Sequence, residues 1–557
     1  MLKDWLLGLS CTVVQGSLEV EVEEVVYDSR KAAPGAVFIC MAGSRVDSHR
    51  FIPQVLEAGV KVLVVEHPVE APKNVTVVQV DNGRVALAYL SAARFGHPSR
   101  KLTMIGVTGT KGKTTTTHMI RTILETAGHK TGMIGTNGVF IGQEHYPTMN
   151  TTPESYELHK YFARMAGEGC GFCVMEVSSQ AFKMHRVDGI LFDYALFTNI
   201  SPDHIGPDEH ESFEEYLYCK SRIFTQCRHA LVNVDDEHVE AVTKDIPCRW
   251  EGFGLEHPAQ YQAEEIRYVS EPDFVGIEFN MAVHGLDGRN ISGDPAQAAG
   301  KVSDSADTGV PQERQPGDAQ AVPKGQSADV LRIPVRVSVA GRFNVYNALA
   351  SAALCILAGV PGEKVRHALE HIRVNGRMEV VYTSETCSVI VDYAHNAVSM
   401  ESLLKTLREY HPKRLVCVFG CGGNRSKDRR YSMGEIAGKL ADFSIITADN
   451  SRFEKVEDII ADIRGSIQKT GGEFLEIPDR REAIAYSITH ARQGDMIAVI
   501  GKGHEDYQEI EGVRYPFLDR QVVEEVVAAM AGCGHFPGAA SEGPDCSINV
   551  AREKYHI

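Results

Sequence analysis

The stretch MIGVTGTKGKTTTTHMIRTILETAG, residues 104–128, decides the fold class of the chain. Its apolar first part predicts a buried strand over Met104–Gly109, and the apolar residues spaced along Met119–Leu124 predict an amphipathic helix. The glycines between them allow a tight turn whose backbone N–H groups can approach phosphate oxygens. A strand, a glycine-rich turn and a helix in this order indicate the phosphate loop of an α/β nucleotide-binding domain.

The turn has the spacing GxxGKT, which is shorter than the usual GxxxxGKT because Val107 stands where a glycine is usual. Lys113 can reach the β- and γ-phosphates of a nucleotide, and Thr114 can ligate Mg²⁺. The alternative is a glycine-rich turn that binds nothing. We expect nucleoside triphosphate binding by Gly109, Thr110, Lys111, Gly112, Lys113, Thr114 and Thr115.

The composition of the 557 residues is that of an ordinary soluble protein, with 43% hydrophobic and 24% charged residues, and it excludes a disordered or fibrous class. The length predicts three domains. Asp and Glu number 74 against 57 Lys and Arg, so the net charge of −17 argues against nucleic acid or an anionic membrane as the main partner. No apolar run approaches the roughly 20 residues that a membrane span needs.

The cysteines and the N-terminus both favour the cytoplasm. The first residues, MLKDWLLGLSCTVV, contain an Asp and a Gly where a secretory signal needs an unbroken apolar stretch. The 13 cysteines are scattered, and several lie in apolar segments, which is typical of reduced thiols in a core. These core candidates are Cys40, Cys173, Cys355 and Cys417.

Short apolar runs alternate with helical patterns along most of the chain, which predicts α/β domains with mainly parallel sheets. Buried strands are expected in VKVLVVE (Val60–Glu66), KLTMIGVTG, RLVCVFGCGG and GDMIAVIGKGHE. The last three end in glycines or polar residues, and ligands of such sheets bind at the carboxyl ends of strands. Residues 293–329 break the pattern because they contain almost no large apolar residues, so we expect a disordered surface insertion there.

The short phosphate loop TGTKGKTTT resembles that of the Mur ligases, the ATP-dependent amide-forming enzymes of peptidoglycan assembly, and of their folylpolyglutamate synthetase relatives. Further motifs follow in the family's order, and DYAH and GKGHE resemble those of the muramyl-tripeptide synthetases within it. The first of them are DSR (Asp28–Arg30), NTTPE (Asn150–Glu154), MEVSS (Met175–Ser179), TNISPDH (Thr198–His204) and GRFNVYNALA (Gly341–Ala350). The others are NGRME (Asn375–Glu379), DYAHNA (Asp392–Ala397), GCGGNR (Gly420–Arg425), DNSR (Asp449–Arg452) and GKGHEDYQ (Gly501–Gln508).

The resemblance implies three α/β domains and a cytoplasmic enzyme, which we expect to act as a monomer. Residues 1–99 would bind the UDP-sugar, and residues 100–374 would form a central ATPase-like domain with a parallel sheet and a phosphate loop. Residues 375–531 would form a Rossmann-like domain that binds the incoming amino acid, and residues 532–557 would be a loose tail.

Amide formation from a carboxylate needs a leaving group, which ATP supplies as an acyl phosphate that an amine then attacks. Negative charge develops on the phosphoryl oxygens, so the site needs Mg²⁺ and placed cations. Glu176 ends the apolar strand GFCVMEV, and its carboxylate is a hard ligand suited to Mg²⁺. The resemblance implies the catalytic residues Lys113, Glu176, His204 and Lys220, with Lys220 carbamylated by CO₂, and the metal site Thr114, Glu176, His204 and Lys220.

The same resemblance implies the substrate contacts. Met184 departs from it, because a glutamine is usual there, and Gln180 stands where a histidine is common. ATP would also contact Asn344, Asn347, Arg377 and Asp392. UDP-muramyl-dipeptide would contact Ser29, Arg30, Asn150, Thr151, Thr152, Ser178 and Arg186. The amino acid would contact Arg430, Asp449, Asn450, Ser451, Arg452, Gly501 and Glu505.

The motif DNSR bears on which amino acid the enzyme adds as the third residue of the stem peptide. In enzymes of the family that use meso-diaminopimelate, this motif is DNPR. The guanidinium of Arg452 can pair with the distal carboxylate of that substrate and would repel the distal ammonium of lysine. Ser451 replaces the proline, which would restrict its own φ angle. Diaminopimelate is therefore favoured over lysine or another diamino acid. A folylpolyglutamate-synthetase-like ligase and a non-catalytic UDP-sugar-binding paralogue remain as alternatives.

Overall fold

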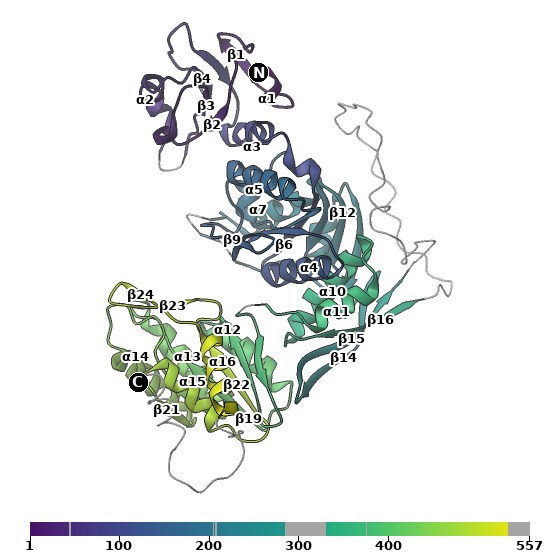
Figure 1. Cartoon of the computed structure of the whole chain (residues 1–557), viewed down its shortest axis with the longest axis vertical. Coiled ribbons are helices and arrows are strands. Elements are labelled where there is room, and N and C mark those ends of the chain that lie inside the picture. Colours follow the sequence, from purple (N-terminus) through teal and green to yellow (C-terminus); the bar gives the residue numbers. More distant parts are fainter. Residues whose placement is uncertain (44–45, 204, 207–208, 285–329, 375, 533–557) are drawn as a thin grey trace. The chain divides into compact units, whose positions relative to one another are not determined.

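A computed structural model describes residues 1–43, 46–203, 205–206, 209–284, 330–374 and 376–532 (Figure 1). The chain divides into two compact units, Met1–Gln262 with Met281–Ile333 and Tyr346–Val365, and Ala263–Asn280 with Pro334–Val345 and Arg366–Ile557. The insertion expected at 293–329, the tail after Gly532 and the candidate His204 lie outside the described residues. None of the helices in the described ranges is long and apolar enough to cross a membrane.

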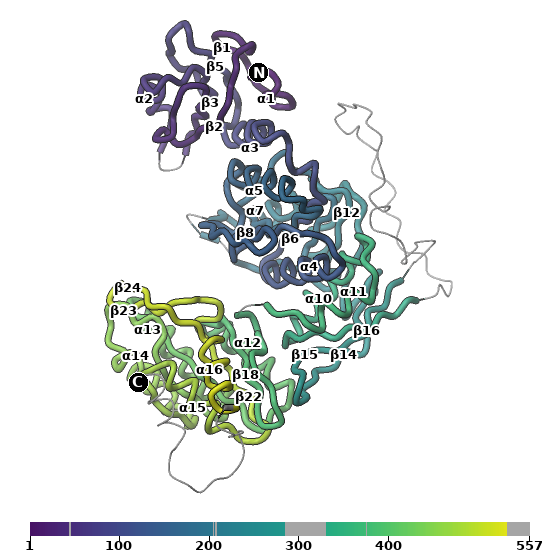
Figure 2. Tube along the Cα trace, in the orientation of Figure 1, coloured from purple at the N-terminus to yellow at the C-terminus, as the bar shows by residue number. Residues whose placement is uncertain are grey.

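The first unit begins with a five-stranded sheet in the order β1-β5-β4-β3-β2, drawn in purple in Figure 2. Strands β3 and β4 are buried along their whole length because apolar side chains cover both faces. The predicted strand VKVLVVE is β4. The strands are β1 Thr12–Gln15, β2 Glu24–Val26, β3 Ala36–Ile39, β4 Val62–Val65 and β5 Thr76–Gln79. The helices are α1 Leu2–Trp5, η1 Ser29–Lys31, η2 Ser48–Phe51, α2 Ile52–Glu57, α3 Gly83–Arg94 and η3 Pro98–Lys101.

The first unit also holds most of a larger sheet, in which β6 lies between the parallel strands β10 and β11. From β13 the order runs β13-β12-β11-β6-β10-β7-β8-β9, and β7, β8 and β9 pair antiparallel. The strand and helix predicted around the phosphate loop are confirmed as β6 and α4. The strands are β6 Thr103–Thr108, β7 Thr131–Gly135, β8 Gly138–Ile141, β9 Glu144–Tyr146, β10 Phe172–Glu176, β11 Phe192–Phe197, β12 Cys227–Asn233 and β13 Arg249–Gly254.

The helices around this sheet supply further candidate residues. They are α4 Lys113–Thr126, α5 Ser155–Gly167, α6 Ser179–Lys183, α7 Phe213–Ser221, η4 Arg222–Gln226 and α8 Val239–Thr243. Strands β14 Tyr261–Glu271, β15 Phe274–Val283 and β16 Leu331–Val337 belong to the same sheet, and their residues are divided between the two units. Helices α10 Arg342–Leu357 and α11 Gly362–Glu370 follow.

The second unit contains a six-stranded sheet in the order β17-β18-β22-β19-β20-β21, parallel except for β17. The predicted strands RLVCVFGCGG and GDMIAVIGKGHE are its central strands β19 and β22. The strands are β17 Glu379–Thr383, β18 Cys387–Asp392, β19 Arg414–Phe419, β20 Phe443–Ile446, β21 Phe474–Glu476 and β22 Asp495–Ile500, and β23 Tyr507–Ile510 and β24 Val513–Pro516 form a hairpin. The helices are α12 Ala397–Arg408, α13 Lys427–Leu440, α14 Val456–Thr470, α15 Arg480–Thr489 and α16 Asp519–Gly532.

Candidate active site

The phosphate loop joins the carboxyl end of β6 to the N-terminus of α4, and its two glycines are sterically required. Gly112 has a φ of +87°, and a Cβ atom there would lie 2.4 Å from Oδ1 of Asn347. At Gly109, with a φ of +149°, a Cβ would lie 2.0 Å from Oγ1 of Thr198. Side chains from α10 and from the end of β11 therefore pack directly against the loop. Only glycine at these two positions allows the backbone N–H groups of the loop to keep their places.

Two lysines converge on the loop. Nζ of Lys113 donates hydrogen bonds to the carbonyl oxygens of Gly109 and Thr110, at 2.8 and 3.1 Å. Nζ of Lys220, on α7, donates to the same Gly109 oxygen at 2.7 Å. The side chain of Lys220 is fully buried and its Nζ lies 4.6 Å from the centre of the Tyr216 ring.

Burial lowers the pKa of Lys113, although Glu176 opposes the shift. Burial and the neighbouring Lys113 cation hold the pKa of Lys220 well below its usual value. Both influences favour the unprotonated, nucleophilic form of the Lys220 amine more than in an exposed lysine.

Glu176 is the last residue of β10, beside the end of β6, and its side chain is buried. Its two carboxylate oxygens accept hydrogen bonds from the backbone N–H and the hydroxyl of Thr136, at 2.9 and 3.2 Å. Burial raises the pKa of Glu176, whereas Lys113 and the hydrogen bonds from Thr136 and Thr114 lower it. Within the described ranges no lysine or arginine forms an ion pair with this carboxylate, so it remains suited to a cation from solution.

Residues expected to grip the muramyl-dipeptide surround the backbone of Glu176. Oγ1 of Thr152 donates to the Glu176 carbonyl oxygen at 2.9 Å and accepts from the N–H of Ser178 at 3.1 Å. Thr151 contacts Thr136 through their hydroxyls at 3.0 Å. The sequence MEVSS and the sequence NTTPE, although distant along the chain, thus form one hydrogen-bonded cluster.

The other candidates of the first unit are less tightly grouped. Arg186 pairs with Glu154 at 2.8 Å and donates to the Thr152 carbonyl oxygen. Arg30 is exposed, and its ion pair with Asp28 at 2.7 Å lies in the N-terminal part. The remaining candidates are Ser29 in η1, Asn150, which is exposed before α5, and Asn347, whose Oδ1 lies 3.3 Å from the Thr116 hydroxyl.

The second unit contains a pocket of about 240 Å³ at the carboxyl ends of its central strands. Its charged lining includes three arginines and two carboxylates, so it can bind a ligand that carries both positive and negative groups. The lining residues are Tyr393, His395, Cys421, Gly422, Arg425, Arg429, Asp449, Asn450, Arg452, Gly501 and Glu505.

The loop Asp449–Arg452 is held from two sides. Nδ2 of Asn450 donates to Glu505 at 3.0 Å, and its Oδ1 accepts from Glu509 N–H at 2.9 Å. Arg452 has a φ of +51°, and its backbone N–H donates to the Glu509 carbonyl oxygen at 2.9 Å. The Arg452 guanidinium pairs with the Glu509 carboxylate at 3.3 Å and donates to Gly423 O at 2.8 Å. Ser451 is buried within this loop and does not line the pocket.

Arg430 lies elsewhere. Its guanidinium is buried and pairs with Glu454 at 2.8 Å and Asp462 at 2.9 Å, and the residue does not line the pocket. Sequence reasoning missed Arg425 and Arg429, which do line it. The signal for Arg425 was its place at the end of the GCGGNR motif after strand β19, where ligands of parallel sheets bind.

Three candidate ATP contacts lie in the second unit. Asp392 is buried and accepts hydrogen bonds from the N–H groups of Met378 and Ala394, both at 2.7 Å, while burial raises its pKa. The guanidinium of Arg377 lies 5.1 Å from the centre of the Tyr393 ring. The amide of Asn344 donates to the carbonyl oxygen of Ala340 at 2.6 Å.

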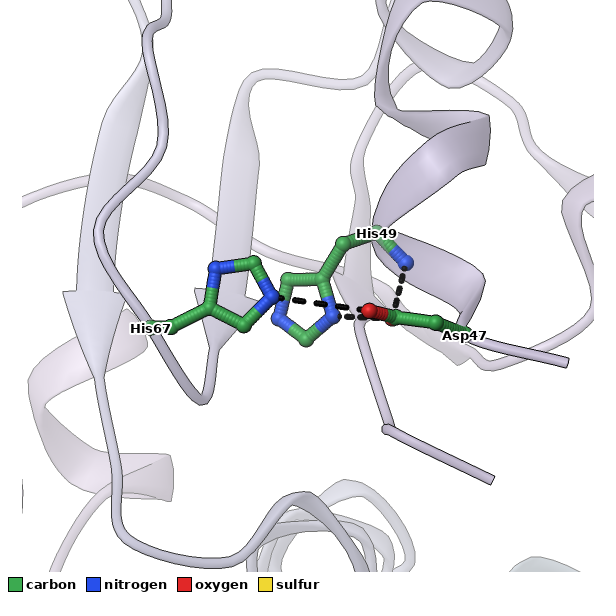
Figure 3. Close-up of side chains that lie close together, drawn as sticks. All are labelled: Asp47, His49 and His67. Atoms are coloured by element: carbon green, nitrogen blue, oxygen red, sulfur yellow. Dashed lines mark hydrogen bonds and ion pairs between the residues drawn. The ribbon is translucent and has the colours of Figure 1, made fainter. Parts of the chain in front are cut away.

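A cluster that resembles a metal site, Asp47, His49 and His67, lies in the N-terminal part (Figure 3). Nδ1 of His49 bonds to the Asp47 carboxylate at 2.5 Å, and its Nε2 accepts the Glu66 N–H at 3.0 Å. An imidazole nitrogen that accepts an N–H must be unprotonated, so the proton of a neutral His49 is on Nδ1 and is donated to Asp47. Neither nitrogen is free for a metal, and the cluster is structural.

Comparisons with known proteins agree with this architecture. The Mur ligase family catalytic domain matches residues 21–95, the Mur ligase middle domain residues 107–292, and the Mur ligase glutamate ligase domain residues 376–503. A UDP-N-acetylmuramoyl-L-alanyl-D-glutamate–2,6-diaminopimelate ligase of Caldanaerobacter subterraneus subsp. tengcongensis is 37% identical over 516 residues, 92% of this chain and 96% of its own.

A similarly named ligase 1 of Clostridium acetobutylicum is 36% identical over 518 residues, with the same shares of the two chains covered. A solved UDP-N-acetylmuramoyl-L-alanyl-D-glutamate–2,6-diaminopimelate ligase structure superimposes with a TM-score of 0.68 at 27% identity, covering 92% of this chain and 95% of that one. The expected three-domain α/β fold is therefore confirmed, and the chain belongs to the Mur ligase family.

Proposed function

We propose that the chain is an ATP-dependent ligase that joins meso-diaminopimelate to UDP-N-acetylmuramoyl-L-alanyl-D-glutamate. The observation that carries the proposal is the charged pocket of the second unit, in which Arg425, Arg429 and Arg452 accompany Asp449 and Glu505. A diamino diacid carries both kinds of charge, and such a lining can pair with each. The names of the relatives support the same substrate pair.

In the first unit the phosphate loop binds the triphosphate of ATP through its backbone N–H groups. Lys113 exchanges its carbonyl partners Gly109 and Thr110 for phosphate oxygens and stabilises the charge that develops on the transferred group. The D-glutamate carboxylate of the nucleotide substrate attacks the γ-phosphorus, ADP leaves, and an acyl phosphate forms. The amine of the amino acid then attacks the acyl carbon, and phosphate and a proton leave as the amide forms.

Mg²⁺ fits the residues present. Glu176 is a buried carboxylate in hydrogen-bonding reach of Thr114, and both side chains offer the hard oxygen ligands that Mg²⁺ prefers. When bound, the ion would neutralise charge on the phosphate oxygens. His204, which the family pattern adds to this set, lies outside the described residues.

Lys220 has the properties that carbamylation requires. In its unprotonated form, which the lowered pKa favours, the buried amine can attack CO₂ and lose a proton, which leaves a carbamate anion. The Lys113 cation that lowers the pKa of the amine would stabilise that anion. The product would supply one more anionic oxygen near the loop. The reaction therefore places an anion beside the Lys113 cation, and the two charges attract each other.

The amino-acid pocket selects by charge. Arg452 is oriented by Glu509 and Gly423, and we propose that its guanidinium binds the distal carboxylate of diaminopimelate. Lysine lacks that carboxylate. Arg425, which lines the same pocket, is our second candidate for carboxylate recognition.

The test is release of phosphate from ATP in the presence of UDP-muramyl-dipeptide and each of meso-diaminopimelate, its isomers, lysine, ornithine and lanthionine. We expect turnover to require both the nucleotide substrate and an amino acid, with the highest kcat/KM for meso-diaminopimelate. A preference for lysine would contradict the substrate but not the ligation. Turnover with folate and glutamate instead, or none with any pair, would contradict the proposal.

A further inference from the structure

Two cysteines meet at the N-terminal ends of neighbouring strands in the first unit's large sheet, whereas the phosphate loop follows the carboxyl end of β6. Cys227 is the first residue of β12, and Cys248 directly precedes β13. These strands are parallel neighbours, so their N-terminal ends lie side by side. The two sulfur atoms are 3.1 Å apart, and both thiols are free. A small movement of either side chain would bring them to bonding distance.

The two thiols differ in accessibility. Cys227 is 8% exposed and belongs to the hydrophobic core, whereas Cys248 is only half-buried at the end of an irregular segment. The two thiols share one hydrogen bond, in which either sulfur can be the donor. Because Cys248 is the more exposed of the two thiols, a molecule from solution meets it first.

We propose that Cys227 and Cys248 form a modification site, a dithiol that a low-molecular-weight disulfide oxidises to an intramolecular disulfide. The Cys248 thiolate attacks one sulfur of the small disulfide, forms a mixed disulfide and expels one thiolate. Cys227 then loses its proton, attacks Sγ of Cys248 and expels the second thiolate. Two protein thiols are oxidised and one small disulfide is reduced to two thiols, so electrons and protons balance.

The disulfide would close residues 227–248 into a covalent loop, and side chains of this loop are hydrogen-bonded to residues next to the phosphate loop. Between the cysteines, Nδ2 of Asn233 donates to the Thr198 carbonyl oxygen at 2.8 Å, and Asp236 accepts the N–H of Ile200 at 2.8 Å. Thr198 in turn donates to the Lys111 carbonyl oxygen at 2.8 Å. Because a crosslink restricts the unfolded chain, we expect oxidation to raise the Tm by several degrees.

The experiment incubates the full-length protein with oxidised glutathione, blocks the remaining thiols by alkylation and maps the peptides by mass spectrometry. In the wild type we expect peptides linked between Cys227 and Cys248, without retained glutathione, and reversal by dithiothreitol. Cys227→Ser should retain glutathione on Cys248, and Cys248→Ser should show neither the link nor an adduct on Cys227. Cys11→Ser, which alters another half-buried thiol of the same unit, is the matched control and should behave as the wild type.

The proposal is independent of the ligase assignment, since it needs no turnover. Glutathione that stays on Cys248 of the wild type would overturn it, because Cys227 would then be unable to resolve the mixed disulfide. So would the absence of the linked peptide at every ratio of oxidised to reduced glutathione. These wild-type results decide the matter even if a serine variant fails to fold.

Discussion

The phosphate loop of the first unit and the arginine-rich pocket of the second hold their cations in different ways. Lys113 and Lys220 are bound to neutral backbone carbonyl oxygens, and neither has an ion pair within the described ranges. In the pocket of the second unit, Arg452 pairs with the carboxylate of Glu509. A lysine held by carbonyls can turn to a phosphate without breaking an ion pair. A paired arginine is oriented in advance, which favours selection over catalysis.

The largest effect is expected for Lys113→Ala, which removes the loop cation. Loss of one charge-stabilising donor typically lowers kcat by about 100- to 1000-fold. Phosphate release measures the effect, and an unchanged Tm would show that the fold is intact. Lys160→Ala, which alters an exposed lysine on α5, serves as the control. Near wild-type ligation by Lys113→Ala would contradict our assignment of the loop.

Lys220→Ala tests the second lysine, and we expect a loss of activity of similar order. Formate or acetate should restore part of it, because a small carboxylate can supply the oxygen ligand that the carbamate provided. The measurement is phosphate release against carboxylate concentration, with Lys113→Ala as a variant that carboxylates should not rescue. Full activity of Lys220→Ala in CO₂-depleted buffer would remove the carbamate from the mechanism.

Arg452→Ala addresses the pocket. Truncating one member of a buried charge pair costs about 2–5 kcal/mol, so the KM for meso-diaminopimelate should rise by roughly 30-fold or more. The KM values for ATP and the nucleotide substrate should stay almost unchanged, and the preference over lysine should narrow. Ser451→Pro should keep or sharpen that preference. Arg464→Ala removes a surface ion pair of the same unit and is the control. An equal rise for all three substrates would contradict the role of Arg452.

Arg425→Ala and Arg430→Ala separate a pocket arginine from a structural one. Arg425→Ala should raise the KM for the amino acid at constant Tm. Arg430→Ala should instead lower the free energy of unfolding by about 3–5 kcal/mol, since Glu454 and Asp462 lose their buried partner. Kinetics and denaturant titrations of both variants give the comparison. A raised KM with unchanged stability in Arg430→Ala would instead show that Arg430 binds the amino acid.

The smallest effect concerns the stability cost of the buried Lys220 amine. The pKa of this amine is lower in the folded chain than in the unfolded chain, so below about pH 10.4 the unfolded chain binds a proton at Lys220 more readily. The free energy of unfolding of the wild type therefore decreases as the pH falls below that value. Lys220→Met removes this loss. In CO₂-depleted buffer the variant should be the more stable form near pH 7, and the difference should shrink as pH rises toward 10. A difference in Tm that does not change with pH would show that Lys220 is charged in the folded protein.

Much of the fold could be predicted because its signals are local. The strand and helix around the phosphate loop, the central strands β19 and β22, and the buried cysteines follow from apolar spacing and glycine positions within short windows. The expected boundaries near residues 100 and 375 remain predictions. The same locality explains why the loop residues could be named from the sequence.

The sequence by itself determined the fold class, the phosphate loop and the family motifs, since each is written in adjacent residues. Only the tertiary structure decided which lysine and arginine side chains are free to bind a ligand. Burial of Lys220 beside Lys113 lowers the pKa of its amine. Arg430 pairs with Glu454 and Asp462, whereas Arg425 lines the pocket. Solvation and charge pairing depend on groups brought together from distant segments, and no spacing along the chain records them.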